Sequence, residues 1–250
     1  MLAWLFVALQ GAVDPAQAVV QLQQAIRNNP AKESNYTELG NMLLRTQNFK
    51  EAAVVLEAAQ ARFPASAQVR LSLGVAYYGQ RRFPEAIGAF LDAARRDADV
   101  EQPVAFLGRI LEHAGGRADE VKSVFAAYAK NHPQNFLGHY LYGKAAADAA
   151  ALRRALALNP ASAECHFELG NLLEQSQDYA GARASYEQAA RLAPKNPAPQ
   201  YRLMRVYTRL GLATQAEAAR EKHQALAAQE TAELEKRQAA TKHLDLRVRP

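Results

Sequence analysis

Apolar residues recur at helical spacing in two adjacent runs between residues 163 and 196, in the stretch AECHFELGNLLEQSQDYAGARASYEQAARLAPKN. The two runs are separated by residues 174–178, none of which carries an apolar side chain. A polar break between two runs of 3.6-residue period predicts a helix, a turn and a second helix. Asp178 stands directly before the second run, in the place where a helix N-cap belongs.

The same pattern returns along most of the chain in units of about 34 residues. Residues 33–66 are the clearest second copy, with a Leu-Gly pair in the first run, alanines in the second run and a closing proline. The matching positions are Leu39-Gly40 with Leu169-Gly170, Ala52 with Ala182, Leu56 with Tyr186, Ala59 with Ala189, and Pro64 with Pro194. Because alternating strand patterns are absent, the sequence predicts an all-α protein of stacked helix pairs.

These residues resemble the signature of the tetratricopeptide repeat family, and the resemblance covers about residues 13–230. It implies a right-handed superhelical solenoid of antiparallel helix pairs, in which Gly at the eighth position and Ala at the twentieth let neighbouring helices pack closely. The units that we expect are a half repeat at 13–32 and repeats at 33–66, 67–100, 101–135, 136–162 (shortened), 163–196 and 197–230.

The unit at residues 136–162 is irregular because it lacks the turn pattern of the others. Gly143 to Pro160 spans 17 residues, whereas Gly170 to Pro194 spans 24. Two structures fit this shortening: two short helices around a turn near Asp148, or one fused helix. The segment is mostly Ala, Leu and Arg with no helix breaker, so we expect the fused helix.

Both ends of the chain depart from the repeat. Residues 1–12 contain an apolar run that is too short to span a bilayer and has the size of a signal-peptide core, although no Lys or Arg precedes it. If residues 1–12 are a cleaved leader, the protein is exported to the periplasm or the medium. If they are not, the protein is cytoplasmic. The sequence leaves both localisations open. Residues 231–250 are expected to form a helical extension to about Ala240 and then a basic tail.

Composition and charge narrow the classes of function. The chain has 250 residues, 49% of them hydrophobic and 22% charged, which is typical of a folded globular protein. Its single cysteine, Cys165, excludes an internal disulfide framework and a cysteine-based zinc site. The formal charge of +5 lies mostly in the tail, so a basic nucleic-acid-binding face is not expected on the repeats. Binding of nucleic acid or an anionic surface by the tail is the alternative hypothesis.

Catalytic motifs are missing from the sequence. The six histidines form no metal-binding spacing, and the adjacent side chains of Cys165 and His166 diverge on one helix, so they cannot act as nucleophile and base. There is no Gly-rich phosphate loop. We therefore expect a protein that is not an enzyme and needs no metal or cofactor.

The family resemblance implies a partner-binding surface instead. In this family the first helices of the repeats line a concave groove that binds peptides, with contacts at positions 2, 5, 9, 12 and 13 of each repeat, and we expect protein or peptide partners, including ones with acidic groups. The expected groove residues are Asn41, Tyr140, Phe167, Asn171, Tyr201, Arg202, Arg205 and Arg209. The aromatic rings would form a platform and the arginines a carboxylate-binding set. The competing interpretations are packing between repeats for the rings and an ordinary solvated face for the arginines.

A known subtype of the groove is excluded. Chaperone-binding members of the family hold a ligand carboxylate with Lys at position 5 and Asn at position 9 of one repeat. Asn41 stands at position 9 here, but Thr37 occupies the lysine position. Chaperone tails are therefore not the expected ligand.

Overall fold

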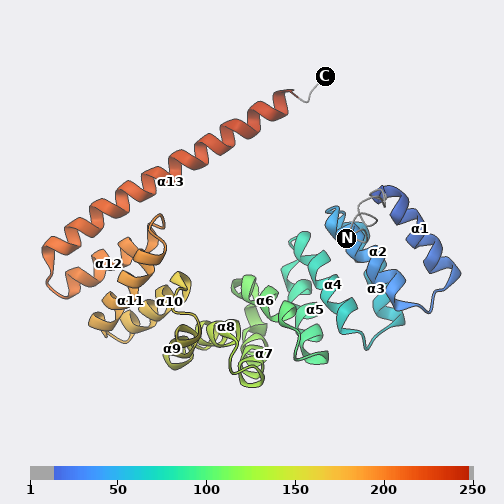
Figure 1. The fold of residues 1–250 in the computed structure, drawn as a ribbon, viewed down its shortest axis with the longest axis horizontal. Helices are drawn as coiled ribbons and strands as arrows, with labels where there is room; N and C mark the ends of the chain where they lie inside the picture. The colour runs from blue at the N-terminus through green and yellow to red at the C-terminus, as the bar shows by residue number, and fades with distance from the viewer. Residues whose placement is uncertain (1–13, 248–250) are drawn as a thin grey trace, which may run out of the picture. The chain divides into compact units, whose positions relative to one another are not determined.

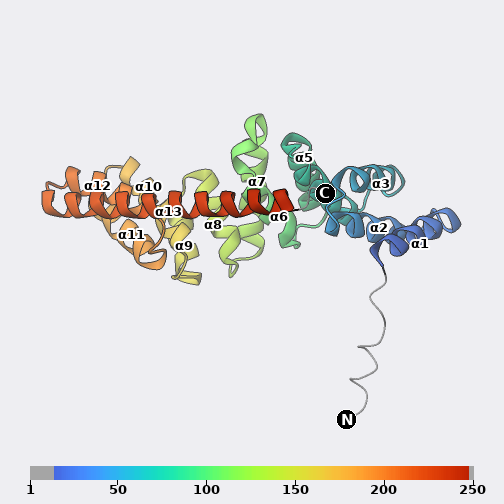
Figure 2. The same ribbon diagram turned by 90° about the horizontal axis from the view of Figure 1, so that it is seen from above.

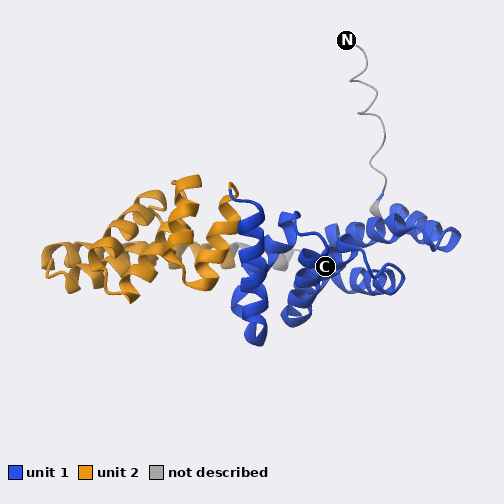
Figure 3. Ribbon diagram, turned by 90° about the horizontal axis from the view of Figure 1, so that it is seen from below, with its two compact units in different colours: residues 1–133 blue, residues 134–250 orange. Residues whose placement is uncertain are grey.

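The computed structural model describes residues 14–247 and, within them, every side chain except those of Pro15 and residues 240–247. The described residues form thirteen α-helices and two short 3₁₀ turns, with no strand, which confirms the all-α prediction. The chain divides into two compact units, residues 1–133 and 134–250 (Figure 3). Residues 1–12, for which the sequence left open whether they form a leader, lie outside the described residues.

Unit 1 consists of consecutive helix pairs (Figure 1). Its elements are α1 (Pro15–Asn28), α2 (Glu33–Arg45), α3 (Phe49–Arg62), α4 (Ala67–Gly79), α5 (Phe83–Arg96), α6 (Glu101–Arg109), the 3₁₀ turns η1 (Leu111–His113) and η2 (Gly115–Arg117), and α7 (Ala118–Asn131). Asp14 caps α1 by accepting the N–H of Ala16 at 3.1 Å. The two 3₁₀ turns take the place of the tight turn seen in the other pairs, where the sequence carries one extra residue.

Unit 2 repeats the arrangement and ends in a long helix (Figures 1 and 2). Its elements are α8 (Phe136–Ala146), α9 (Ala149–Leu158), α10 (Ala163–Gln175), α11 (Tyr179–Leu192), α12 (Ala198–Arg209) and α13 (Ala213–Arg247). Asp178 caps α11 as predicted, accepting the N–H of Gly181 at 2.9 Å. Helix α13 runs past Ala240, where the sequence was expected to leave the helix.

The turns within the pairs share one backbone conformation. One residue just past the end of the first helix adopts a positive φ, with values from 52° to 74°. It is the second residue after the helix at Gln47, Arg81, Gln177 and Gly211, and the first residue after it at Ala147. The next N–H reaches back to the carbonyl five residues earlier, for example from Asp178 to Leu173 at 2.9 Å. This is the Schellman closure of a helix, which satisfies carbonyl groups that the helix end leaves free.

This turn overturns the fused helix expected for residues 136–162. Ala147 has φ 52° and ψ 41°, and the N–H of Asp148 bonds to the carbonyl of Gly143 at 2.9 Å. Asp148 then caps α9 by accepting the N–H groups of Ala150 and Ala151. The unit is therefore a short helix pair. Helix propensity alone favoured fusion, but capping and the packing of Leu152 on Gly143 decide the structure.

Close approach at the glycine position is confirmed in four pairs. A Cβ added at Gly170 would lie 2.6 Å from the ring of the buried Tyr186, which is below any normal contact distance. Equivalent additions at Gly40, Gly74 and Gly143 would meet Leu56, Phe90 and Leu152 at 2.7, 2.5 and 2.8 Å. The first helix thus lies directly on the largest core side chain of the second helix.

A hydrogen bond between successive repeats occurs at the same place in both units. The Tyr77 hydroxyl donates to Glu57 and the Tyr207 hydroxyl to Glu187, both at 2.9 Å. Burial, followed by the hydrogen bond to the carboxylate, raises the pKa of each tyrosine to about 12. The two units therefore share the chemistry as well as the geometry of the repeat.

Candidate functional site

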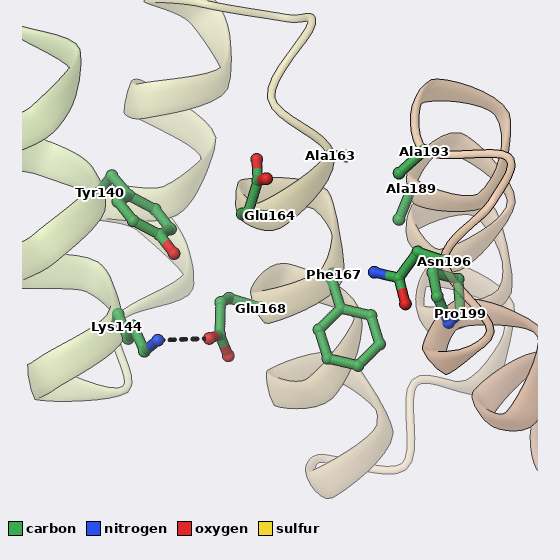
Figure 4. A pocket seen from close by; sticks show the side chains of 10 residues that line it. All are labelled: Tyr140, Lys144, Ala163, Glu164, Phe167, Glu168, Ala189, Ala193, Asn196 and Pro199. Atoms are coloured by element: carbon green, nitrogen blue, oxygen red, sulfur yellow. Dashed lines mark ion pairs between the residues drawn. The ribbon is translucent and has the colours of Figure 1, made fainter. Parts of the chain in front are cut away.

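Unit 2 has an open pocket of about 160 Å³ at the N-terminal half of α10 (Figure 4). Helix α8 forms one wall with Tyr140 and Lys144, and α10 supplies Glu164, Phe167 and Glu168. The other wall is made by Ala189 of α11, by Ala193 and Asn196 of the connection that follows it, and by Pro199 of α12. The pocket therefore lies between the first helices of three successive helix pairs.

Aromatic rings make up the apolar part of this pocket. Tyr140 is stacked on Phe136 with ring centroids 5.6 Å apart, and Phe167 lies 5.6 Å from the ring of Tyr186. Burial, then the nearby carboxylate of Glu168, raises the pKa of Tyr140 to about 12. Two of the three expected platform residues, Tyr140 and Phe167, thus line one pocket and also support the packing between repeats, whereas Tyr201 does not line it.

Charged groups surround the rings unevenly. The Lys144 ammonium lies 3.0 Å from a Glu168 carboxylate oxygen, so these two charges compensate each other (Figure 4). Glu164 is exposed and has no ion pair among the described side chains; it accepts only a long hydrogen bond of 3.4 Å from the Ser162 hydroxyl. The three groups together carry one net negative charge at neutral pH.

One neutral polar group also faces the pocket. The side-chain oxygen of Asn196 accepts the N–H of Ala198 at 3.0 Å. Its amide nitrogen points toward Phe167, away from that cap (Figure 4). An amide N–H in this position can donate to a carbonyl of an extended peptide.

A second cluster lies at the other end of α10, around Glu174. This carboxylate is 12% exposed, and it accepts a hydrogen bond from the Tyr186 hydroxyl at 2.8 Å. Arg202 and Arg205 on α12 approach it at 3.5 and 3.2 Å. Two guanidinium groups therefore share one carboxylate, which leaves a net positive charge at this end.

Asn171 belongs to the same cluster, and most of the hydrogen-bonding groups of its side chain have partners within the protein. Its amide oxygen lies 2.9 Å from the Tyr186 hydroxyl, which has a single proton to share between Asn171 and Glu174, and its nitrogen donates to Glu168 at 3.1 Å. Only the second amide N–H of Asn171 is left for a ligand.

The remaining expected residues are placed separately. Tyr201 is 43% exposed and its ring lies 5.5 Å from that of His223 on α13. Arg209, at the end of α12, is exposed and has no ion pair among the described side chains. Asn41 lies in unit 1, where its side-chain oxygen accepts from the Ser72 hydroxyl at 2.9 Å. The structure therefore brings Tyr140 and Phe167 together in one pocket and Asn171, Arg202 and Arg205 together around Glu174, while Tyr201, Arg209 and Asn41 belong to neither group.

Three acidic residues and one amide of this surface were not predicted. They are Glu164, Glu168, Glu174 and Asn196. Glu164 and Glu174 stand at positions 2 and 12 of their repeat, both contact positions in the resembled family, so reading every contact position would have found them. Glu168 and Asn196 lie outside those positions and become visible only in three dimensions.

No group of His, Cys, Asp and Glu side chains suited to hold a metal occurs among the described residues. Cys165 is buried, and burial raises its pKa to about 12, which makes its thiol a poor nucleophile. Within residues 14–247, no helix has the length and apolar character needed to cross a bilayer.

Two stretches match models of the tetratricopeptide repeat family, residues 37–101 and residues 163–196. No curated protein matches the chain. Among solved structures, YrrB, described as a TPR protein with an unusual peptide-binding site, is 14% identical with a TM-score of 0.61, over 72% of this chain and 96% of YrrB.

Two further solved structures show the same fold. PilW, described as a widely conserved type IV pilus biogenesis factor, is 18% identical with a TM-score of 0.61, over 77% of this chain and 92% of PilW. PilF of Pseudomonas aeruginosa is 19% identical with a TM-score of 0.56, over 79% of this chain and 97% of PilF. The repeated helix pairs, the family matches and these folds agree: the chain is an all-α tetratricopeptide repeat protein, and the fold is generally a non-catalytic scaffold for protein interactions.

Proposed function

We propose that unit 2 binds an extended peptide segment of a partner protein, and that the chain acts as a scaffold without catalysis. The observation that carries this proposal is the pocket beside α10, because it joins the aromatic side chains of two successive first helices, α8 and α10, with an outward amide donor from the connection that precedes α12. Pockets that fix a peptide combine apolar walls with a few placed polar groups. The fold shared with YrrB, a protein with a peptide-binding site, supports the proposal.

The arginine cluster extends this site toward the other end of α10. Arg202 and Arg205 already neutralise Glu174, so a ligand carboxylate gains most from Arg209 and from the surplus positive charge of the pair. We therefore assign the acidic group of the partner to this end, and a second side chain of the same peptide to the pocket. An extended backbone between them meets the donors of Asn171 and Asn196.

Peptide selection followed by site-specific crosslinking tests this proposal. Random dodecapeptides displayed on phage are selected on the immobilised full-length chain. A selected peptide is then irradiated with variants that carry a benzophenone amino acid in place of Tyr201 or, as a control, of Ala184 on α11; both positions are exposed, so neither substitution disturbs the core.

We expect crosslinking at Tyr201 and little at Ala184. The acidic partner group is tested by Arg209→Ala, which should weaken the peptide, and by Arg191→Ala on α11, which should not. Equal crosslinking at both benzophenone positions, or failure to select any peptide, would refute a binding site on this face.

A further inference from the structure

We infer that the pocket beside α10 takes a lysine or arginine side chain of the partner, so that the bound peptide carries a basic residue in the pocket and an acidic group four or five residues away. This inference rests on the peptide-binding function proposed above and specifies its ligand. It follows from the charges that the described side chains leave uncompensated.

The pocket end is acidic. Lys144 and Glu168 form a close ion pair at 3.0 Å, which leaves the exposed Glu164 carboxylate as the surplus charge. An acidic side chain of the ligand in this pocket would be repelled by Glu164, because Glu164 has no ion-pair partner among the described side chains. A cation placed beside Glu164 would gain the attraction of the one carboxylate that no described cation compensates.

The apolar walls suit a long basic side chain in particular. Tyr140 on α8 and Phe167 on α10 offer ring surfaces to the pocket, and Ala189 and Ala193 line its other wall with small side chains (Figure 4). Lysine and arginine carry an aliphatic stem that packs on apolar surface while the charged head stays near water. A cation over an aromatic face adds further attraction.

The opposite end of the same helix is basic, since Arg202 and Arg205 share Glu174 and Arg209 follows them on α12. Glu164 and Glu174 are ten positions apart on α10, which at the helical rise is about 15 Å. An extended chain covers that distance in about four or five residues. The two ends therefore fix both the spacing of the ligand charges and the direction of the peptide.

Charge reversal on both partners tests the inference. A selected peptide is measured by fluorescence anisotropy against the full-length chain, Glu164→Gln and Glu164→Lys. Loss of one exposed carboxylate should weaken binding roughly fivefold or less, and reversal should weaken it further. A peptide whose basic residue is changed to Glu should bind Glu164→Lys better than it binds the original chain. Glu221→Gln removes an exposed carboxylate of α13 and should leave the affinity unchanged.

The possible failures are distinguishable. If selected peptides crosslink at Tyr201 but contain no basic residue, or if Glu164→Lys does not prefer the reversed peptide, the inference is wrong while the proposed function stands. If no peptide crosslinks there above the Ala184 control, the proposed function fails and the inference falls with it.

Discussion

Replacing Gly74 by alanine should destabilise unit 1, although alanine is the better helix former. The added Cβ would lie 2.5 Å from a ring carbon of Phe90, a fully buried side chain of α5. Forcing a methyl group into a packed core costs about 1–3 kcal/mol. Replacing glycine by alanine in a helix interior otherwise stabilises the folded state by only about 0.5–1 kcal/mol. The free energy of unfolding of unit 1 should therefore fall by about 0.5–2 kcal/mol.

Gly88→Ala is the matched control, because Gly88 lies in α5 of the same helix pair. A Cβ there would meet only the terminal nitrogen of the Arg117 side chain, at 3.0 Å, and that flexible group can move. The control should be neutral or stabilising by up to about 1 kcal/mol. Hydrogen exchange of α4 and α5 at increasing urea, read by mass spectrometry, reports the free energy of this pair directly. If both variants stabilise the pair equally, the close helix contact is not what the glycine provides.

Three further predictions follow from the turns and from the tyrosine hydroxyls that donate to glutamates. Ala147→Gly should stabilise unit 2 by about 1 kcal/mol, since alanine is strained at φ 52°, whereas Ala146→Gly in the helix should destabilise it; the opposite order of urea midpoints would contradict the turn. Asp178→Ala should cost about 1 kcal/mol through loss of the α11 cap, and an unchanged midpoint would show that the cap contributes nothing. Tyr77 and Tyr207 have folded pKa values of about 12, above the ordinary value near 10, so the stability present below pH 10 should fall between pH 10 and 12; a native absorbance titration with every tyrosine ionising near pH 10 would refute the raised values.

Much of the fold could be predicted because each repeat encodes it locally. The apolar period placed the helices, the Leu-Gly pair marked the close contact, and Asp178 marked the start of α11. The turn at Ala147 could not be read in this way. An alanine-rich segment favours continuous helix by propensity, and the contact of Gly143 with Leu152 that opposes it forms only when the chain folds back.

The candidate site was predictable only in part, for a related reason. Tyr140 and Phe167 were found because they stand at a repeat position that faces the neighbouring first helix. That Arg202 and Arg205 would be occupied by Glu174 could not be known, because the partner is on a helix of the preceding repeat and side-chain reach decides the pairing. Which charges remain without a counter-charge depends on how side chains of different repeats meet in the folded protein, so the sequence alone does not show it.

Chemical-shift mapping of a selected peptide on the isotope-labelled chain tests whether the peptide occupies the pocket beside α10. The largest amide shifts should fall on Tyr140, Glu164, Phe167 and Asn196, with a second group at the end of α12 near Arg209. Shifts confined to α11, to α13 or to unit 1, with the residues of this pocket unchanged, would contradict it.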